Sequence, residues 1–284
     1  MWTISKLTVK EIIYKRVFTV IFLLSLLFLI VYGIGTHFTQ VKLIHGRSSL
    51  HVMEKGFFST QLIGMGLYLA AFMSSLLAIF SACGSVSREI ESGQIDPVLS
   101  RPLPRHSFIM GRTMGLSILL LLYSLVMFMG VTCINKYVGG HLAMSFTSTQ
   151  LAQALGLFLL QPIILIAASI FCSTRFSTLN SGIIMVMTYV ITMIGGFIEQ
   201  FGALLEEQTM IHIGIISSLL FPLDSVFRKM TLSLFAASDD PLSFATSGIF
   251  GSASIPSNLM IVYAAFYGVI ALFFAIRLFK SRDL

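Results

Sequence analysis

The chain has 284 residues and a formal net charge of +6 at pH 7, and its composition excludes an ordinary water-soluble domain. Apolar residues make up 56% of the sequence and charged residues only 11%, with a mean hydropathy of +0.92. These values are typical of integral membrane proteins, and the positive charge requires no nucleic-acid partner because an anionic inner leaflet is a sufficient one.

Six apolar runs are long enough to cross a hydrocarbon core of about 30 Å as helices that rise about 1.5 Å per residue. The backbone has no water to bond within lipid, so these runs must be helical. We therefore expect an all-α integral membrane protein with one domain over residues 1–284 and with spans at Val17–Ile34, Leu62–Cys83, Thr113–Ile134, Leu151–Cys172, Ser181–Ile198 and Leu259–Ile276.

The distribution of Lys and Arg predicts the side of the membrane that each loop faces. Most of the 18 basic residues lie in the two terminal segments and in the connections after the second and fourth spans. By the positive-inside rule, both termini and residues 85–112 are expected in the cytoplasm, in a multi-pass protein of the cytoplasmic membrane. The first apolar run lacks a cleavage site and is long for a signal peptide, so we expect it to remain as the first span.

The N-terminal segment, residues 1–16, combines apolar and basic side chains. Trp2, Val9 and Ile13 fall on one side of a helical wheel, with lysines beside them. This pattern predicts a short helix along the inner membrane surface, with Trp2 at headgroup depth. The alternative is a solvated basic leader.

Histidines and cysteines do not predict a metal site or a disulfide. His37, His45 and His51 lack i,i+4 pairing and a neighbouring cluster of cysteines or carboxylates. The three cysteines lie at the ends of different spans and contain no C-x-x-C motif, so they are expected to be packed thiols. We expect no metal or other cofactor bound directly by the chain.

The coupling loop, residues 85–112, is the most charged part of the chain and joins two uncharged apolar runs. Residues 85–94 can form a short helix that Gly93 breaks, and Asp96 and Pro97 are typical of the N-cap and first residue of a second helical turn. Two further prolines direct the chain into the third span. The loop is therefore predicted to be stiff and to face the cytoplasm; a plain charged connector is the alternative.

Within their predicted bounds, the spans contain no ionisable Asp, Glu, Lys, Arg or His. This pattern disfavours an ion-coupled carrier, an ion channel and an intramembrane enzyme. No phosphate-binding G-x-x-x-x-G-K-[ST] motif occurs, so energy for transport would come from a partner. In the fourth span Pro162 predicts a kink, with Gln161 available to bond nearby backbone or a neighbouring helix.

The outer segment, residues 199–257, is the largest predicted extramembrane piece. Its apolar run Met210–Phe221 is too short to cross the bilayer, and Pro222 stops it, so we expect an interfacial or re-entrant helix. Apolar residues then recur at helical spacing, with Asp224 and Arg228 on the polar face, which predicts an amphipathic second helix.

The coupling loop resembles the cytoplasmic motif of type-2 ABC-transporter permeases. The matching residues are Glu89-x-Glu91-x-Gly93, the run from Val98 to Arg105 and the pair Gly111-Arg112. A second segment, from Leu219 to Arg228, is similar to the Pro-x-Asp outer helix of permeases of the nitrous-oxide-reductase maturation group. The likeness covers nearly the whole chain.

This resemblance implies a permease subunit that pairs with a second copy or a paralogue and docks a separate cytoplasmic ABC ATPase through a coupling helix. ATP and Mg²⁺ are then expected on the ATPase, and the chain itself is not an enzyme. The site residues expected from the resemblance and from the loop charges fall into three sets: ATPase coupling at Glu89, Glu91, Gly93, Leu99, Ser100 and Arg101; membrane-surface anchors at Arg105, Arg112 and Arg175; and the outer helix at Pro222, Asp224 and Arg228.

A second reading is a membrane anchor or assembly factor that transports nothing and engages an extracytoplasmic partner through residues 199–257. An intramembrane enzyme is a third reading, which no sequence feature favours. The substrate is left open, because an uncharged path suits lipids, amphipathic drugs, peptides and metallo-sulfur species alike.

Overall fold

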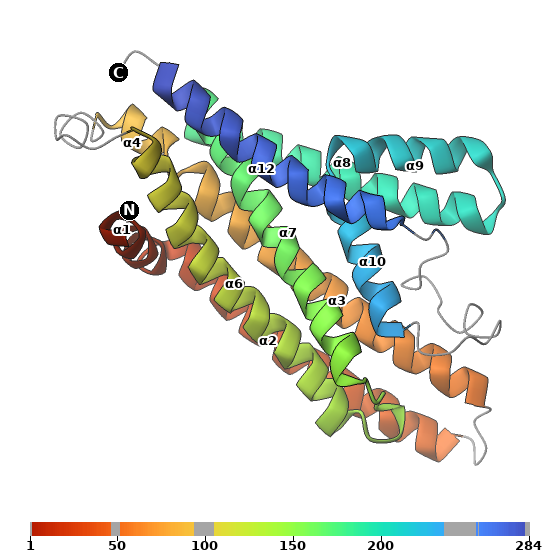
Figure 1. Ribbon diagram of the computed structural model, residues 1–284. Helices are drawn as coiled ribbons and strands as arrows, with labels where there is room; N and C mark the ends of the chain where they lie inside the picture. The colour runs from red at the N-terminus through yellow and green to blue at the C-terminus, as the bar shows by residue number, and fades with distance from the viewer. Residues whose placement is uncertain (1, 47–51, 94–104, 236–253, 255, 282–284) are drawn as a thin grey trace.

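The computed structural model describes residues 2–46, 52–93, 105–235, 254 and 256–281, and its regular elements within these residues are all helices (Figure 1). Six of them are long and apolar enough to cross a membrane, which confirms the predicted all-α membrane protein with six candidate spans. They are α2 (Arg16–Gly46), α3 (Val52–Cys83), α6 (Arg105–Val138), α7 (Ser148–Arg175), α8 (Thr178–Leu204) and α12 (Asn258–Ser281).

The helices extend beyond the apolar runs that predicted them. α6 begins at Arg105 and α8 ends at Leu204, so Arg112 and Glu199 lie inside helices and not beyond their ends. An apolar window closes at the first charged residue, whereas a helix continues through charged residues whose side chains reach water or find partners. The spans as the structure bounds them are therefore longer than the predicted apolar interiors, and they include ionisable residues towards their ends.

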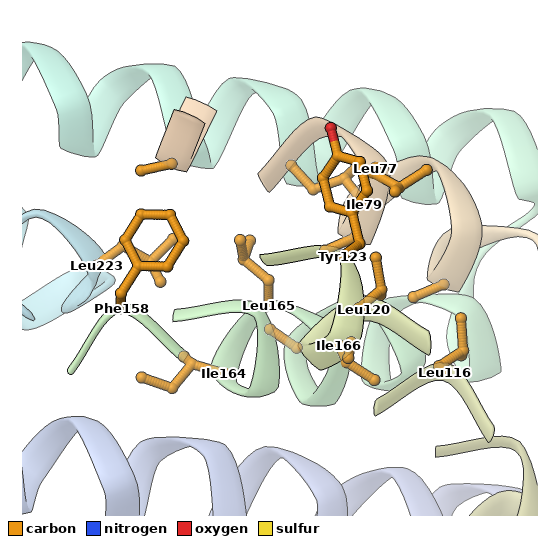
Figure 2. Packing of buried hydrophobic residues seen from close by; sticks show 14 of the residues in the cluster. Leu77, Ile79, Leu116, Leu120, Tyr123, Phe158, Ile164, Leu165, Ile166 and Leu223 are labelled. Atoms are coloured by element: carbon orange, nitrogen blue, oxygen red, sulfur yellow. The ribbon is translucent and has the colours of Figure 1, made fainter. Parts of the chain in front are cut away.

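α7 is the central helix of the bundle, and α3, α6, α10 (Leu223–Phe235) and α12 all pack against it. Small α7 residues such as Ala154, Ala168 and Ser169 let the neighbouring helices approach α7 closely. Such close packing matters in lipid, where the hydrophobic effect does not hold helices together and van der Waals contacts do. Figure 2 shows the apolar contacts around α7, made by the buried residues Leu77, Ile79, Leu116, Leu120, Phe158, Ile164, Leu165, Ile166 and Leu223.

Pro162 lies inside α7, which continues as one helix from Ser148 to Arg175. Gln161 beside it is 4% exposed, and its amide nitrogen has no hydrogen-bond partner among the described residues. The bond predicted from Gln161 to nearby backbone or to a neighbouring helix is thus not made by this nitrogen.

Two shorter helices follow α8. α9 (Gln208–Leu220) runs back along α8, and a bend of 106° after Leu220 leads into α10 (Figure 1). The apolar helix that Pro222 ends and the amphipathic helix after it were both predicted, and both are confirmed as helices. The pair has the form of a broken span or a re-entrant loop. α9 lies so close to α8 that a Cβ atom at Gly214 would overlap the Glu199 side chain.

Both described chain ends lie at one end of the bundle, together with α1 (Trp2–Ile13) and the five-residue α4 (Ser87–Glu91) (Figure 1). We refer to this as the α4 end. α1 packs on α6 through Ser5, Thr8 and Ile12, while Trp2 and Ile13 are exposed. A 3-10 turn at Gly140–Leu142 joins α6 and α7 at the opposite end.

Candidate functional site

The first helix of the coupling loop is α4, which ends at Glu91 and is followed by Ser92 and Gly93. Gly93 has a φ of 66°, a left-handed conformation that glycine adopts without steric cost. The short helix and its break at Gly93 are therefore confirmed, although the helix is shorter than expected. The predicted second turn, Val98–Ser100, and the candidate contact residue Arg101 fall outside the described residues.

Arg112 is the centre of an ion-pair network at the α4 end. Its two terminal guanidinium nitrogens contact carboxylate oxygens of Glu89 and Glu11, and Glu11 also accepts a hydrogen bond from Lys15 Nζ at 2.8 Å. The Arg112 side chain is 8% exposed. A buried guanidinium is stable only when paired carboxylates replace its water. The network, named here the Arg112 network, thus links α1, α4 and α6.

This geometry differs from the roles predicted for two of its members. Arg112 was expected to anchor the membrane surface, but its side chain lies inside the protein between two carboxylates. Glu89 was expected to contact an ATPase, and its carboxylate is already paired within the chain. The Arg112 guanidinium also lies 5.6 Å from the centre of the Phe108 ring, which stacks on Phe279 of α12.

The ionisation of Glu11 suits this arrangement. Burial acts to raise the pKa of the Glu11 carboxyl, but the hydrogen bonds and charges of Lys15 and Arg112 outweigh burial, and the pKa is lowered below its usual 4.5. Glu11 is therefore ionised at neutral pH, as pairing with Arg112 requires.

Hydrogen bonds join α4 to α7 and α8 as well. Glu91 Oε1 accepts from the Thr178 backbone N–H at 2.8 Å, and Glu91 Oε2 accepts from the Thr178 hydroxyl at 3.1 Å. Ser173 Oγ of α7 accepts from the backbone N–H groups of Val86 and Ser87, at 3.2 and 2.9 Å. A carboxylate at the first residue of α8 satisfies a free N–H group and interacts favourably with the helix dipole.

The other two predicted anchors lie at the same end of the bundle. Arg175 is exposed at the last residue of α7, and Arg105 is the first residue of α6. Their position is compatible with the membrane surface, and their anchoring role stays a prediction. Sequence reasoning missed Glu11 and Thr178. The signal for Glu11 was available, since it is the single acidic residue of the basic segment 1–16.

A second buried cluster lies where α10 meets α8, and we name it the Arg228 cluster. The Arg228 guanidinium donates to both oxygens of Glu199, each at 2.7 Å, and its Nε donates to Asp224 Oδ2 at 2.8 Å. Ser254 Oγ donates to Glu199 Oε1 at 2.6 Å. The side chains of Arg228, Glu199 and Asp224 are 3%, 5% and 9% exposed. The cluster is therefore buried, and it joins α8 to α10.

Sequence reasoning found two of the three charged members. Asp224 and Arg228 were singled out together with Pro222, which directly precedes α10, and the structure brings the two charged residues into contact. Glu199 was placed just beyond its span, where it had no evident partner. A glycine makes the contact possible, because a Cβ atom at Gly196 would overlap the Asp224 carboxyl group.

Across the described part of the chain, no three His, Cys, Asp or Glu side chains gather in a way that could hold a metal ion. The Arg112 network and the Arg228 cluster both join helices across the bundle through ion pairs. Separating the partners of a buried ion pair is costly. Such contacts can transmit the displacement of one helix to another.

Comparison with known families agrees with this membrane architecture. A family model described as "ABC-2 family transporter protein" matches residues 2–284, a range that includes the Arg112 network, the Arg228 cluster and all six candidate spans. Among curated proteins, no sequence matched the chain.

Proposed function

The chain belongs to the ABC-2 transporter family, and from this premise we propose that it forms half of a dimeric permease that a separate ATPase drives through the α4 region. It is a multi-pass membrane protein, the permease of an ABC system, and its family implies an ATPase subunit as partner. The proposal adds that both termini and the coupling loop face the cytoplasm, that ATP and Mg²⁺ bind the ATPase, and that the pair carries a substrate across the cytoplasmic membrane. We also propose that the chain is similar to the nitrous-oxide-reductase maturation permeases, a likeness that rests on the segment from Leu219 to Arg228.

One observation carries the proposal: α4 makes specific polar contacts with three other helices and is linked to a fourth through Arg112. Glu89 pairs with Arg112 of α6, which in turn pairs with Glu11 of α1. Glu91 bonds the first residue of α8, and the start of α4 bonds Ser173 of α7. A force on this five-residue helix would therefore act on α1, α6, α7 and α8 at once.

The same contacts indicate different roles for different members of the predicted coupling residues. The Glu89 and Glu91 carboxylates face partners within the chain, so we assign them to transmitting movement from α4 to the spans. Contact with the ATPase then falls to Leu99, Ser100 and Arg101, which the sequence places between the α4 helix and α6.

The test is purification of the tagged full chain from its native membranes. An ABC ATPase, recognised by mass spectrometry from its Walker A motif, should accompany the chain and hydrolyse ATP. Arg101→Glu should reduce the recovered ATPase by about tenfold, the loss expected when one interfacial ion pair becomes a repulsive contact. Arg277→Glu, at an exposed position of α12 at the same end, should leave recovery unchanged. Equal recovery from both variants would refute the docking assignment.

Orientation is tested separately by labelling a single thiol. Ser92 is exposed directly after α4, and Cys133 is the one exposed native cysteine. Ser92→Cys in a Cys133→Ser background should react with a membrane-impermeant maleimide in inside-out vesicles and not in intact cells. Labelling in intact cells alone would place the coupling loop on the wrong side and overturn the transport proposal.

A further inference from the structure

We propose that the groove between α2, α3 and α8 at the α4 end binds one anionic phospholipid. The groove has a volume of about 700 Å³ and is lined by the first residues of α2, the last of α3 and the first three turns of α8, with Arg88 of α4 above them. The inference concerns the chain alone, with no ATPase present, and it therefore goes beyond the proposed function.

The wall of the groove is apolar. Phe18, Phe80, Ile183, Val186 and Met187 line it, and they come from three different helices. A volume of this size suits a drug-sized ligand or the upper part of a lipid, including its headgroup region. An acyl chain laid against these side chains would make the same packing contacts that hold the spans to one another.

The rim of the groove is positively charged. Lys15, Arg16 and Arg88 line it, and no acidic side chain among the described residues does. Lys15 is paired with Glu11, whereas Arg16 and Arg88 are exposed and have no ion-pair partner in the described residues. Two uncompensated cations beside an apolar wall match an anionic headgroup on an apolar tail. Free phosphate would leave the wall uncovered, and a zwitterionic phospholipid would pair its phosphate with the cations but place its own positive charge beside them.

A second copy of the chain is a poorer occupant of this groove. It would have to bring carboxylates to Arg16 and Arg88 or bury both cations unpaired, which is costly. The acidic side chains described near this end already have partners within the chain. Exposed acids do occur at Glu206 and Glu207, but these follow the far end of α8. Charge complementarity therefore favours a lipid over self-association.

A tryptophan reporter tests the proposal, because Trp2 is the single tryptophan of the chain. In a Trp2→Phe background, Phe80→Trp places the reporter in the groove and Phe274→Trp places one on the surface of α12. Both phenylalanines are 47% exposed, so the two reporters are matched. Quenching is measured in proteoliposomes of phosphatidylcholine and phosphatidylglycerol, with bromine on the chains of one lipid or the other.

The expected result is selective quenching in the groove. Each basic side chain at the surface favours an anionic lipid about fivefold, so Phe80→Trp should report roughly a 25-fold preference for phosphatidylglycerol. Phe274→Trp should show little preference. Arg16→Gln/Arg88→Gln should reduce the preference at Phe80→Trp to less than about threefold, which is the residual effect of one paired lysine.

Arg175→Gln/Arg277→Gln removes the same charge from exposed positions at the same end and is the matched control. It should leave the preference at Phe80→Trp unchanged. If both double variants lose the lipid preference equally, the preference reflects only the net charge of the protein, and the proposal is overturned. Equal quenching of the groove reporter by both lipids would also overturn it. A groove reporter that neither lipid quenches would show that another part of the protein, such as a second copy, covers the groove.

Discussion

Removing Arg228 should destabilise the protein far more than neutralising Glu199. Arg228 serves two carboxylates, with three hydrogen bonds of 2.7 to 2.8 Å in a site less than a tenth exposed. Breaking a buried ion pair costs about 3–5 kcal/mol because the remaining charge is left without water or a partner. Arg228→Met leaves two such charges, so we expect a loss near 5 kcal/mol. Glu199→Gln keeps a side chain of the same shape that still accepts a hydrogen bond, at a cost of about 1 kcal/mol.

The assay is thermal unfolding in detergent, followed by size-exclusion chromatography. At about 2–4 °C per kcal/mol for a chain of this size class, the two variants should differ by more than about 8 °C. Adding Glu199→Gln and Asp224→Asn to Arg228→Met removes the orphaned charges and should recover most of the loss. If Arg228→Met and Glu199→Gln unfold within 2 °C of each other, where about 8 °C is expected, the cluster is not the buried ion-pair site described above.

Three further predictions concern the α4 end. Gly115→Val should detach α1 from α6, because a Cβ atom at Gly115 would meet the backbone and side chains of α1. Limited proteolysis should then cleave α1 faster. Gly156→Val is the control, because a Cβ atom at Gly156 faces open space. Glu91→Ala should speed hydrogen exchange in the first turn of α8 and leave α12 unchanged. Because the pKa of Glu11 is lowered by folding, its contribution to stability is present above pH 4.5 and is lost as the pH falls below that value. The melting temperature of Glu11→Gln should therefore fall less on acidification than that of the native chain.

The number of spans was predictable because crossing a bilayer requires long apolar runs, whatever the helices pack against. Helix ends were less so. The predicted third span began at Thr113, yet α6 begins at Arg105, and the added turns carry Arg112 into the protein. The partners of Arg112, Glu11 and Glu89, are distant from it or lie in another helix. Sequence periodicity describes contacts within one helix and cannot predict a pair that tertiary packing brings together. Asp224 and Arg228, by contrast, are four residues apart and could be matched by helical spacing alone.

α1 illustrates a second reason why packing was hard to predict. Sequence reasoning drew attention to its apolar side, Trp2, Val9 and Ile13. The structure instead buries Ser5, Thr8 and Ile12 against α6. Hydrophobicity is a poor guide at a membrane surface, because lipid accepts an apolar side chain as well as another helix does. Small side chains decide the contact, since they let α1 reach the backbone of α6 at Gly115.

α8 connects the two groups of buried polar contacts. Its first residue, Thr178, is held by Glu91, and Glu199 near its other end is held by Arg228. Between residues 178 and 199 an α-helix rises about 30 Å, which is the thickness of the hydrocarbon core. A helix bonded at both ends and continuous between them moves as one body. A displacement that begins at α4 can therefore reach α10 across the bilayer without a charged residue in the middle of the span, and the one charged residue of α8, Glu199, lies near its end.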